Sequence, residues 1–250
     1  MKKPDSIKKL LIDGDLICYR ACCGPDSWTD AQCGIDASYT TLGNIIENTG
    51  VKDVEIYFSG ENNFRYKIFP EYKANRRKME RPPSLPVVKQ HFISSPEQVA
   101  DELEADDLLG LNQTEDTCIV SIDKDMLTIP GWHYNFVKDE FIYITPEEAT
   151  YRFYYQLLVG DPADGIKGAK GIGAKKAEKI LQDCEVEEHY FESCRDYFSS
   201  YEEMKMNASC LWIQRAGRLT WEEGIDTPIG QGQGQSPTED YSEGPPWDLS

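Results

Sequence analysis

Short apolar runs that end in carboxylates recur along this chain of 250 residues. The run KKLLID ends at Asp13, and the run TCIVSID ends at Asp123, with Asp125 two residues later. Two further acidic clusters, EADD at 104–107 and GDPAD at 160–164, stand where a helix or turn begins. Such strands alternating with helical stretches predict an α/β fold with a mostly parallel central sheet. Because parallel strands end at one edge of a sheet, the carboxylates are expected to converge there.

The coarse order of elements agrees with this fold class. Strands are expected at 8–13, 54–60, 117–123 and 141–145, and helices at 16–23, 36–48, 97–111, 147–160 and 171–182. The helix at 97–111 places Glu104 and Asp107 on one face. The stretch 61–90 is basic and proline-containing, and it predicts an exposed loop or a mobile helical element.

Composition excludes several classes of protein. No apolar run approaches the roughly 18 residues that a membrane span needs, and the basic start turns acidic too early for a signal peptide. The eight cysteines include no Cys-x-x-Cys pair, and only three histidines could supplement them at a zinc site. We therefore expect a cytoplasmic protein without membrane contact and with reduced thiols.

The distribution of charge matters more than its sum. A net charge of −18 argues against a polyanionic partner, but basic residues gather in two segments, 65–81 and 167–179. These segments predict two basic patches on an acidic body, able to guide nucleic acid to one place.

The acidic clusters themselves favour metal chemistry. A single Asp at the end of a strand is more often a helix cap or a turn residue. Convergent carboxylates without clustered His or Cys suit hard cations such as Mg²⁺ or Mn²⁺. Packed together without metal they repel one another, which raises the pKa of several. Two ions about 4 Å apart could act on both sides of an in-line displacement.

A glycine-rich basic loop follows the last acidic cluster. GIGAKKA lacks the spacing of a nucleotide P-loop, so ATP binding is disfavoured. It fits a helix–hairpin–helix, in which backbone N–H groups at a helix N-terminus hold a phosphate without reading bases. The alternative is a tight turn with a solvated lysine face. The predicted DNA contacts in this loop are Lys170, Gly171, Gly173, Lys175 and Lys176.

FPEYKANRRK combines an aromatic residue with cations. Tyr72 could stack on a base, and Lys73 and Arg76 could hold the scissile phosphate. A solvated basic loop is the alternative. Arg77 and Lys78 in the same segment, and the more distant Arg20, are further expected DNA contacts.

Five motifs of this chain occur in the same order as in the 5′→3′ exonuclease and flap endonuclease family: LIDGD, FPEYKANR, EADD, SIDKD and GDPADGIKGAKGIGAKKA. The chain resembles this family over about residues 8–182. Within it, the chain is most similar to stand-alone bacteriophage 5′ nucleases of the podovirus type. The resemblance implies the PIN-like, resolvase-like 5′ nuclease fold and a carboxylate site with two Mg²⁺ ions. In that family pattern the first-metal positions are Asp13, Glu104 and Asp106, with Asp107 as a supporting carboxylate, and the second-metal positions are Asp123, Asp125, Asp161 and Asp164.

The resemblance also implies a division of the chain. Residues 1–160 would form the nuclease core, and 161–218 a helical region with the helix–hairpin–helix, often with a K⁺ ion. Residues 74–92 would be a helical arch, disordered without DNA, with Lys73 and Arg76 at its base. The Gly-, Gln- and Pro-rich stretch 219–250 is expected to be a disordered acidic tail, with docking of a replication partner as a further use. The implied substrates are DNA with free 5′ ends, flaps or junctions, and RNA in hybrids, acted on by a monomer in the host cytoplasm.

One departure from the family pattern affects the first metal. The family carries an Asp at the end of the second core strand, where this chain has Gly60, so Glu61, Asn62 or water would have to substitute. Two rival functions remain open. One is a non-catalytic DNA-junction binding protein with the same fold, which Gly60 favours. The other is a PIN-type ribonuclease, which would lack the helix–hairpin–helix.

Overall fold

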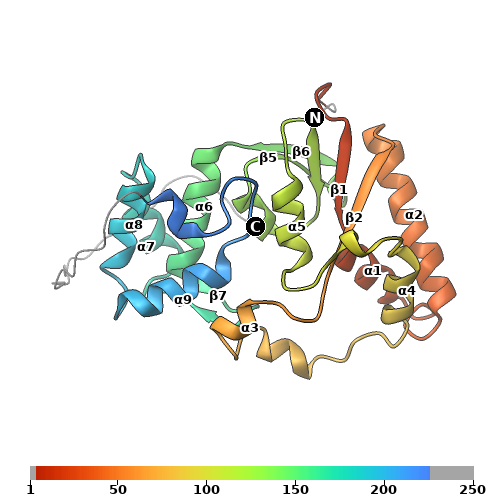
Figure 1. Cartoon of the computed structure of the whole chain (residues 1–250), viewed down its shortest axis with the longest axis horizontal. Helices are drawn as coiled ribbons and strands as arrows, with labels where there is room; N and C mark the ends of the chain where they lie inside the picture. Colours follow the sequence, from red (N-terminus) through yellow and green to blue (C-terminus); the bar gives the residue numbers. More distant parts are fainter. Residues whose placement is uncertain (1–3, 226–250) are drawn as a thin grey trace.

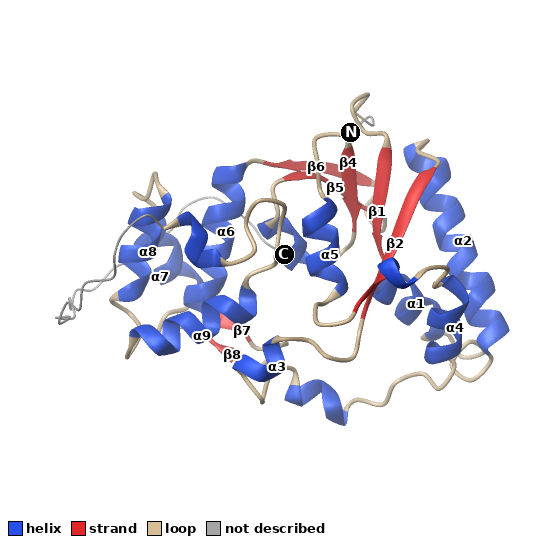
Figure 2. Cartoon of the chain, in the orientation of Figure 1, coloured by secondary structure: helices blue, strands red, loops and turns tan. Residues whose placement is uncertain are grey.

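The computed structural model describes residues 4–225, except the side chain of Arg77. A six-stranded sheet lies beside a region made mostly of helices (Figures 1 and 2). The strand order is β3-β2-β1-β4-β5-β6, and all neighbours are parallel except β5 and β6. The strands are β1 (Lys9–Asp13), β2 (Asp53–Ser59), β3 (Val99–Ala100), β4 (Thr117–Val120), β5 (Gly131–Asn135) and β6 (Glu140–Ile144). The predicted fold class, a mostly parallel sheet flanked by helices, is confirmed.

The central strand β1 shows why the sheet is covered on both faces. Leu10 and Ile12 are buried among residues from α2 and the sheet, whereas Leu11 is buried among residues from α5. Helices α1 (Gly14–Cys22), α2 (Ala31–Thr49) and α4 (Leu85–Phe92) lie on one side, and α5 (Ala105–Asn112) lies on the other (Figure 1). A parallel strand buried on both faces needs a continuous apolar run, as this one has.

The predicted helix at 97–111 is wrong in its first half. A 3-10 turn, η2 (Pro96–Gln98), leads into β3, and α5 begins only at Ala105. The two residues of β3 pair with the end of β2, so the backbone of this stretch finds its hydrogen-bond partners in the sheet rather than in a helix. Helical periodicity in the sequence could not reveal this pairing.

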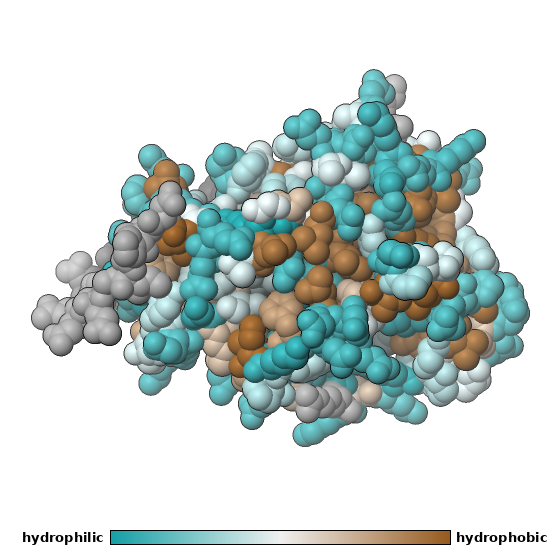
Figure 3. Space-filling view, viewed as in Figure 1, coloured by the Kyte–Doolittle hydropathy of each residue, from teal (hydrophilic) through white to brown (hydrophobic). Residues whose placement is uncertain are grey.

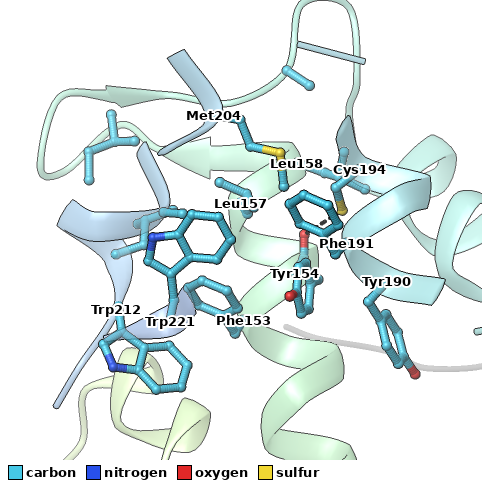
Figure 4. Close-up of a cluster of buried hydrophobic side chains, with 14 of the residues drawn as sticks. Phe153, Tyr154, Leu157, Leu158, Tyr190, Phe191, Cys194, Met204, Trp212 and Trp221 are labelled. Carbon is cyan, nitrogen blue, oxygen red and sulfur yellow. Dashed lines mark hydrogen bonds between the residues drawn. The ribbon is translucent and has the colours of Figure 1, made fainter. Parts of the chain in front are cut away.

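The helical region has its own hydrophobic core (Figure 4). Phe153, Tyr154, Leu157 and Leu158 of α6 contribute to it, so one face of α6 packs against this region. The other elements are hairpin strands β7 (Gly160–Asp161) and β8 (Ile166–Lys167), helices α6 (Pro146–Val159), α7 (Ala174–Leu181), α8 (Glu187–Arg195) and α9 (Tyr201–Leu211), and the 3-10 turn η4 (Trp221–Gly224). No helix within residues 4–225 is long and apolar enough to cross a membrane.

The expected tail begins later than predicted. Trp221 is 1% exposed and lies in the helical core, where its indole nitrogen donates to the hydroxyl of Ser209. Residues 219–225 are therefore part of the fold. The rest of the predicted tail, 226–250, lies outside the described residues.

The predicted arch, residues 74–92, is partly a packed helix. From α3 (Arg65–Ile68) the chain runs through a 3-10 turn, η1 (Ala74–Lys78), and along the molecule to α4. The surface along this path is mostly hydrophilic on the face shown in Figure 3. Val88 of α4 is fully buried against α1 and α2. Ser84 donates from its hydroxyl to the carbonyl of Ser27 and from its backbone N–H to the carbonyl of Trp28. Residues 85–92 are therefore a packed helix in this structure, which differs from the disorder expected for the arch.

Candidate active site

The acidic clusters stand at the carboxyl ends of β1 and β4 and at adjoining turns. β1 and β4 are neighbours, although the chain visits β2 and β3 between them, so their carboxyl ends mark a topological switch point of the kind that binds ligands in open α/β sheets. Asp13 is the last residue of β1. Asp123 follows β4 by three residues and begins the 3-10 turn η3 (Lys124–Thr128).

In three of the clusters, one carboxylate oxygen accepts a hydrogen bond from a nearby backbone N–H. Oδ1 of Asp13 accepts from the backbone N–H of Leu16, and Oδ1 of Asp123 accepts from that of Asp125. Oδ1 of Asp161 likewise accepts from the backbone N–H of Ala163. Each of these side chains is thus fixed by the element that it caps. The interpretation of a single Asp at a strand end as a cap or turn residue is therefore correct for these three residues.

Mutual repulsion shows that the clusters meet. Burial, and then repulsion by Asp13 and Glu104, raises the pKa of Asp106 well above its usual value. Burial also raises the pKa of Asp13 to about 7, with further contributions from Asp15 and Asp123. These side chains come from β1, α5 and the turn after β4, so three separate segments share one electrostatic environment.

The carboxylates after β4 and around β7 share a second electrostatic environment. Burial raises the pKa of Asp125 to about 7, and repulsion by Asp123, Asp161 and Asp164 adds to it. Gln156 of α6 donates from Nε2 to Oδ1 of Asp125 over 2.9 Å. No sequence pattern pointed to Gln156, because nothing in its helical context distinguishes it from a surface residue.

Lys73 and Arg76 lie among these carboxylates. Lys73 adopts a left-handed backbone conformation, with φ at 54°, and its ammonium pairs with Glu104 and lies 3.5 Å from Asp164. Nη2 of Arg76 lies 2.5 Å from Oδ1 of Asp164. Asn75 donates to the carbonyls of Pro162 and Ala163, which fixes this segment to the turn after β7. The structure therefore brings both predicted phosphate-binding cations to the carboxylates.

Tyr72 does not have its predicted role, and Asp107 can act only as a supporting carboxylate. Tyr72 is 2% exposed, and its hydroxyl faces Glu104 at 2.9 Å and Asp164 at 3.0 Å, so its ring cannot stack on a base. Asp107 is fully buried and cannot bind a metal, because both of its oxygens accept hydrogen bonds from Arg65. Arg65 itself is buried and does not belong to the basic surface that its segment suggested. In each case the sequence shows an ordinary polar residue, and only tertiary packing buries it.

The position of Gly60 has a steric explanation. A Cβ atom there would lie 2.1 Å from the carbonyl oxygen of Ala100, so β3 leaves no room for the expected carboxylate. Asn62 is engaged with Asp101, and Glu61 is exposed. A different carboxylate, Asp15, accepts from the backbone N–H of Ser59 at the end of β2 and pairs with Lys89.

The predicted DNA contacts separate into groups. The predicted contacts in the loop before α7 and in the first turn of α7 are all exposed; they are Lys170, Gly171, Gly173, Lys175 and Lys176. Within this loop, Gly171 adopts the left-handed conformation, with φ at 76°. Lys78 is exposed at the end of η1. Arg20 lies in the last turn of α1, about 10 Å along the helix from Asp13, beside a cavity of about 450 Å³. The helix–hairpin–helix stays a prediction.

The donor chemistry suits a hard divalent cation, because the clustered groups are carboxylates. Within residues 4–225, however, no three His, Cys, Asp or Glu side chains are arranged to hold one ion. Glu104 and Asp164 are instead paired with cations of the protein, and Asp125 with an amide. Metal binding would require these side chains to exchange partners.

Relatives with curated descriptions share most of this chain. A 5′-3′ exonuclease of Buchnera aphidicola subsp. Schizaphis graminum is 31% identical over 200 residues, which is 69% of each chain. The counterpart in the subspecies Acyrthosiphon pisum is 29% identical over 82% of this chain and 79% of its own. DNA polymerase I of Borreliella burgdorferi is 31% identical over 58% of this chain but only 18% of its own length.

Solved structures share the fold at lower identity. The D15 protein of bacteriophage T5, crystallised with metal ions, superposes with a TM-score of 0.60 at 16% identity, over 80% of this chain and 87% of that one. The T5 5′-exonuclease with bound zinc superposes with a TM-score of 0.59 at 17% identity, over 81% of this chain and 88% of that one. Residues 8–160 match the model of the 5′-3′ exonuclease N-terminal resolvase-like domain. The chain belongs to the 5′-3′ exonuclease family.

Proposed function

We propose that this nuclease is a divalent-metal-dependent 5′ nuclease that hydrolyses DNA at free 5′ ends, flaps and junctions, and RNA in hybrids, leaving 5′-phosphates. One observation supports this most: Lys73 and Arg76 pair with Glu104 and Asp164, and Glu104 in turn shares an electrostatic environment with Asp106 and Asp13. The T5 flap endonuclease, which has a similar fold, has been crystallised with DNA and metal ions.

The carboxylates would hold two ions, Mg²⁺ or, in its place, Mn²⁺. Asp13, Glu104 and Asp106 would hold the first, and Asp123, Asp125, Asp161 and Asp164 the second. When bound, such ions supply activation of the attacking water and stabilisation of the leaving oxygen. Asp107 is left out of this set because its oxygens are already hydrogen-bonded.

Lys73 and Arg76 would bind the phosphate under attack. In the structure both cations neutralise Glu104 and Asp164. On ion binding they would be released toward the phosphate oxygens, where charge develops during hydrolysis. Tyr72 would keep Glu104 and Asp164 apart at a fixed spacing through its hydroxyl.

The exposed basic loop before α7 would hold duplex DNA by its phosphates. Its cations and the backbone N–H groups at the start of α7 suit contacts that do not read bases, and a K⁺ ion would complete a helix–hairpin–helix there. We further propose that the protein acts as a monomer in phage replication in the host cytoplasm, and that residues 226–250 bind a replication protein.

Cleavage of a 5′-flap substrate with Mg²⁺ and with EDTA tests the proposal. We expect Mg²⁺-dependent cleavage, and we expect Asp123→Ala to lower kcat by about 10²- to 10³-fold or more. Duplex binding by this variant, measured by fluorescence anisotropy, should stay within about twofold, because the predicted duplex-binding segment is residues 165–182. Lost binding with retained cleavage would contradict this assignment.

The alternative, a junction-binding protein without catalysis, is favoured by the absence of a carboxylate at Gly60. The same assay decides between them. Metal-independent binding of flap DNA without cleavage in Mg²⁺ or Mn²⁺ would establish the alternative.

A further inference from the structure

Arg65 is the most deeply buried charged side chain near the site after Asp107, and it uses nearly all of its hydrogen-bonding capacity. It is 1% exposed. Its Nη1 and Nη2 donate to the two oxygens of Asp107 over 2.6 and 2.9 Å. Its Nε donates to the carbonyl of Cys210 over 2.8 Å, and Nη2 also donates to that of Trp212 over 2.7 Å. The fork of the guanidinium group is what allows one side chain to bind so many acceptors in one plane.

These bonds join the ends of two helices that are distant in sequence. Asp107 occupies the first turn of α5, and its Oδ2 also accepts from the backbone N–H of Glu104 over 3.0 Å. Cys210 and Trp212 stand at the C-terminal end of α9. Arg65 thus places one positive charge between a carboxylate at a helix N-terminus and the carbonyls at a helix C-terminus, both of which favour it.

The segment after α9 also contacts α5 directly. The backbone N–H of Gln214 donates to Oδ1 of Asp107 over 3.0 Å. A Cβ atom on Gly110 of α5 would lie 2.2 Å from the carbonyl oxygen of Gln214, so the two backbones approach as closely as glycine permits. The start of α5 is therefore held by residues 210–214 of the helical region, through Asp107 and through backbone contact.

The start of α5 carries two of the carboxylates of the site. Glu104 is its N-cap and Asp106 its second residue. Oε2 of Glu104 lies 3.7 Å from Nη1 of Arg65, which is an ion-pair distance but too long for a hydrogen bond. Movement of Arg65 would therefore change both the position of the Glu104 backbone, through Asp107, and the charge that its carboxylate faces.

We propose that Arg65 is a positioning residue that ties residues 210–214 to the start of α5 and so sets the placement of Glu104 and Asp106 for metal binding. This inference rests on the proposed function. Partners that orient metal ligands in this way commonly change metal affinity 10- to 100-fold when removed. The competing explanation is that the Arg65–Asp107 pair serves stability alone.

The chain offers a matched control for that explanation. Arg218 and Glu187 form a second bidentate pair, at 2.7 and 2.6 Å, and Arg218 also donates to a backbone carbonyl, that of Trp221. This pair lies in the helical region and touches none of the clustered carboxylates. The two double variants are Arg65→Gln with Asp107→Asn, and Arg218→Gln with Glu187→Gln. Each removes both charges of one pair and leaves no charge buried alone.

The readouts are the melting temperature, Mn²⁺ affinity of the DNA-free protein by electron paramagnetic resonance, and kcat and KM on a flap substrate. For the Arg65 pair we expect Mn²⁺ affinity to fall about 10- to 100-fold and kcat to fall with it, while KM for DNA stays within about twofold. For the Arg218 pair we expect a lower melting temperature, with Mn²⁺ affinity and kcat unchanged. Arg65→Lys keeps the charge without the fork, and it should lie between wild type and the double variant in Mn²⁺ affinity.

The inference is overturned if the Arg65 pair behaves as the control does, losing stability but keeping Mn²⁺ affinity within twofold. If the double variant does not fold, Arg65→Lys decides in the same way: weaker Mn²⁺ binding supports the positioning role, and unchanged binding overturns it. A wild-type protein that neither binds Mn²⁺ nor cleaves DNA would instead overturn the proposed function.

Discussion

At the scale of single residues, burial decides what each carboxylate can do. Asp107 and Asp106 are neighbours in EADD, yet Asp107 is neutralised by a buried guanidinium group, whereas the pKa of Asp106 is raised by burial and by other carboxylates. A carboxylate that is hydrogen-bonded to a buried guanidinium group, as Asp107 is, serves the structure. A carboxylate that lies among like charges, as Asp106 does, is unfavourable in its ionised form until a cation binds.

This difference predicts how stability depends on pH. In the folded metal-free protein the pKa of Asp13 and of Asp125 is raised from 3.8 to about 7. Between these values the unfolded chain binds fewer protons than the folded one, so the free energy of unfolding falls as pH rises from about 4 to about 7. We expect the melting temperature without metal to fall from pH 5 to pH 7.5.

Added Mg²⁺ should counteract this loss, because ligating carboxylates must be deprotonated. The rise in melting temperature on adding Mg²⁺ should therefore be larger at pH 8 than at pH 6. Asp125→Asn should reduce the pH dependence of the metal-free protein. A Mg²⁺ effect that is equal at both pH values would show that these carboxyls do not titrate with metal binding.

At the scale of elements, the stretch 75–84, which lies between β2 and β3 in the chain, is fixed at both ends. Its start is bound to the turn after β7 through Asn75 and Arg76, and its end is bound to the loop after α1 through Ser84. Helix α4 continues from that second anchor and packs against α1 and α2. Between these two anchors, residues 77–83 run from one region to the other.

Two valines of α4 test whether the helix is part of the core without DNA. Val88 is fully buried and Val87 is 57% exposed. Val88→Ala should lower the free energy of unfolding by about 1–3 kcal/mol through lost burial and a cavity, whereas Val87→Ala should change it by less than about 0.5 kcal/mol. Urea denaturation of the DNA-free protein measures both. Equal effects would mean that α4 is not packed in solution.

At the scale of the whole molecule, the site takes its carboxylates from two regions, the sheet with its helices and the helical region. The sheet and its helices supply Asp13, Glu104, Asp106 and Asp123, while the turn after α6 supplies Asp161 and Asp164. The site is therefore complete only when both regions are folded and held together. Tyr72, which lies in the helical core and faces carboxylates of both regions, is one such link.

Two truncations test where the folded molecule ends. Removing residues 219–250 takes away Trp221, which is 1% exposed, whereas removing 226–250 keeps it. The longer deletion should be less stable than the shorter by about 3–5 kcal/mol, the usual cost of losing a buried tryptophan. Thermal and urea denaturation of the two proteins provide the comparison. Equal stability would place residues 219–225 outside the fold.

The family resemblance placed Lys73 and Arg76 near the carboxylates, whereas patterns of neighbouring residues were enough to predict the parallel sheet and its acidic edge. These follow from local patterns, since strand periodicity and the position of Asp at a strand end are properties of neighbouring residues. Tertiary structure alone decided that Asp107, Tyr72 and Arg65 are buried, that β3 excludes a side chain at Gly60, and that α4 is packed. Each of these depends on contacts between residues far apart in the chain, which no local pattern encodes.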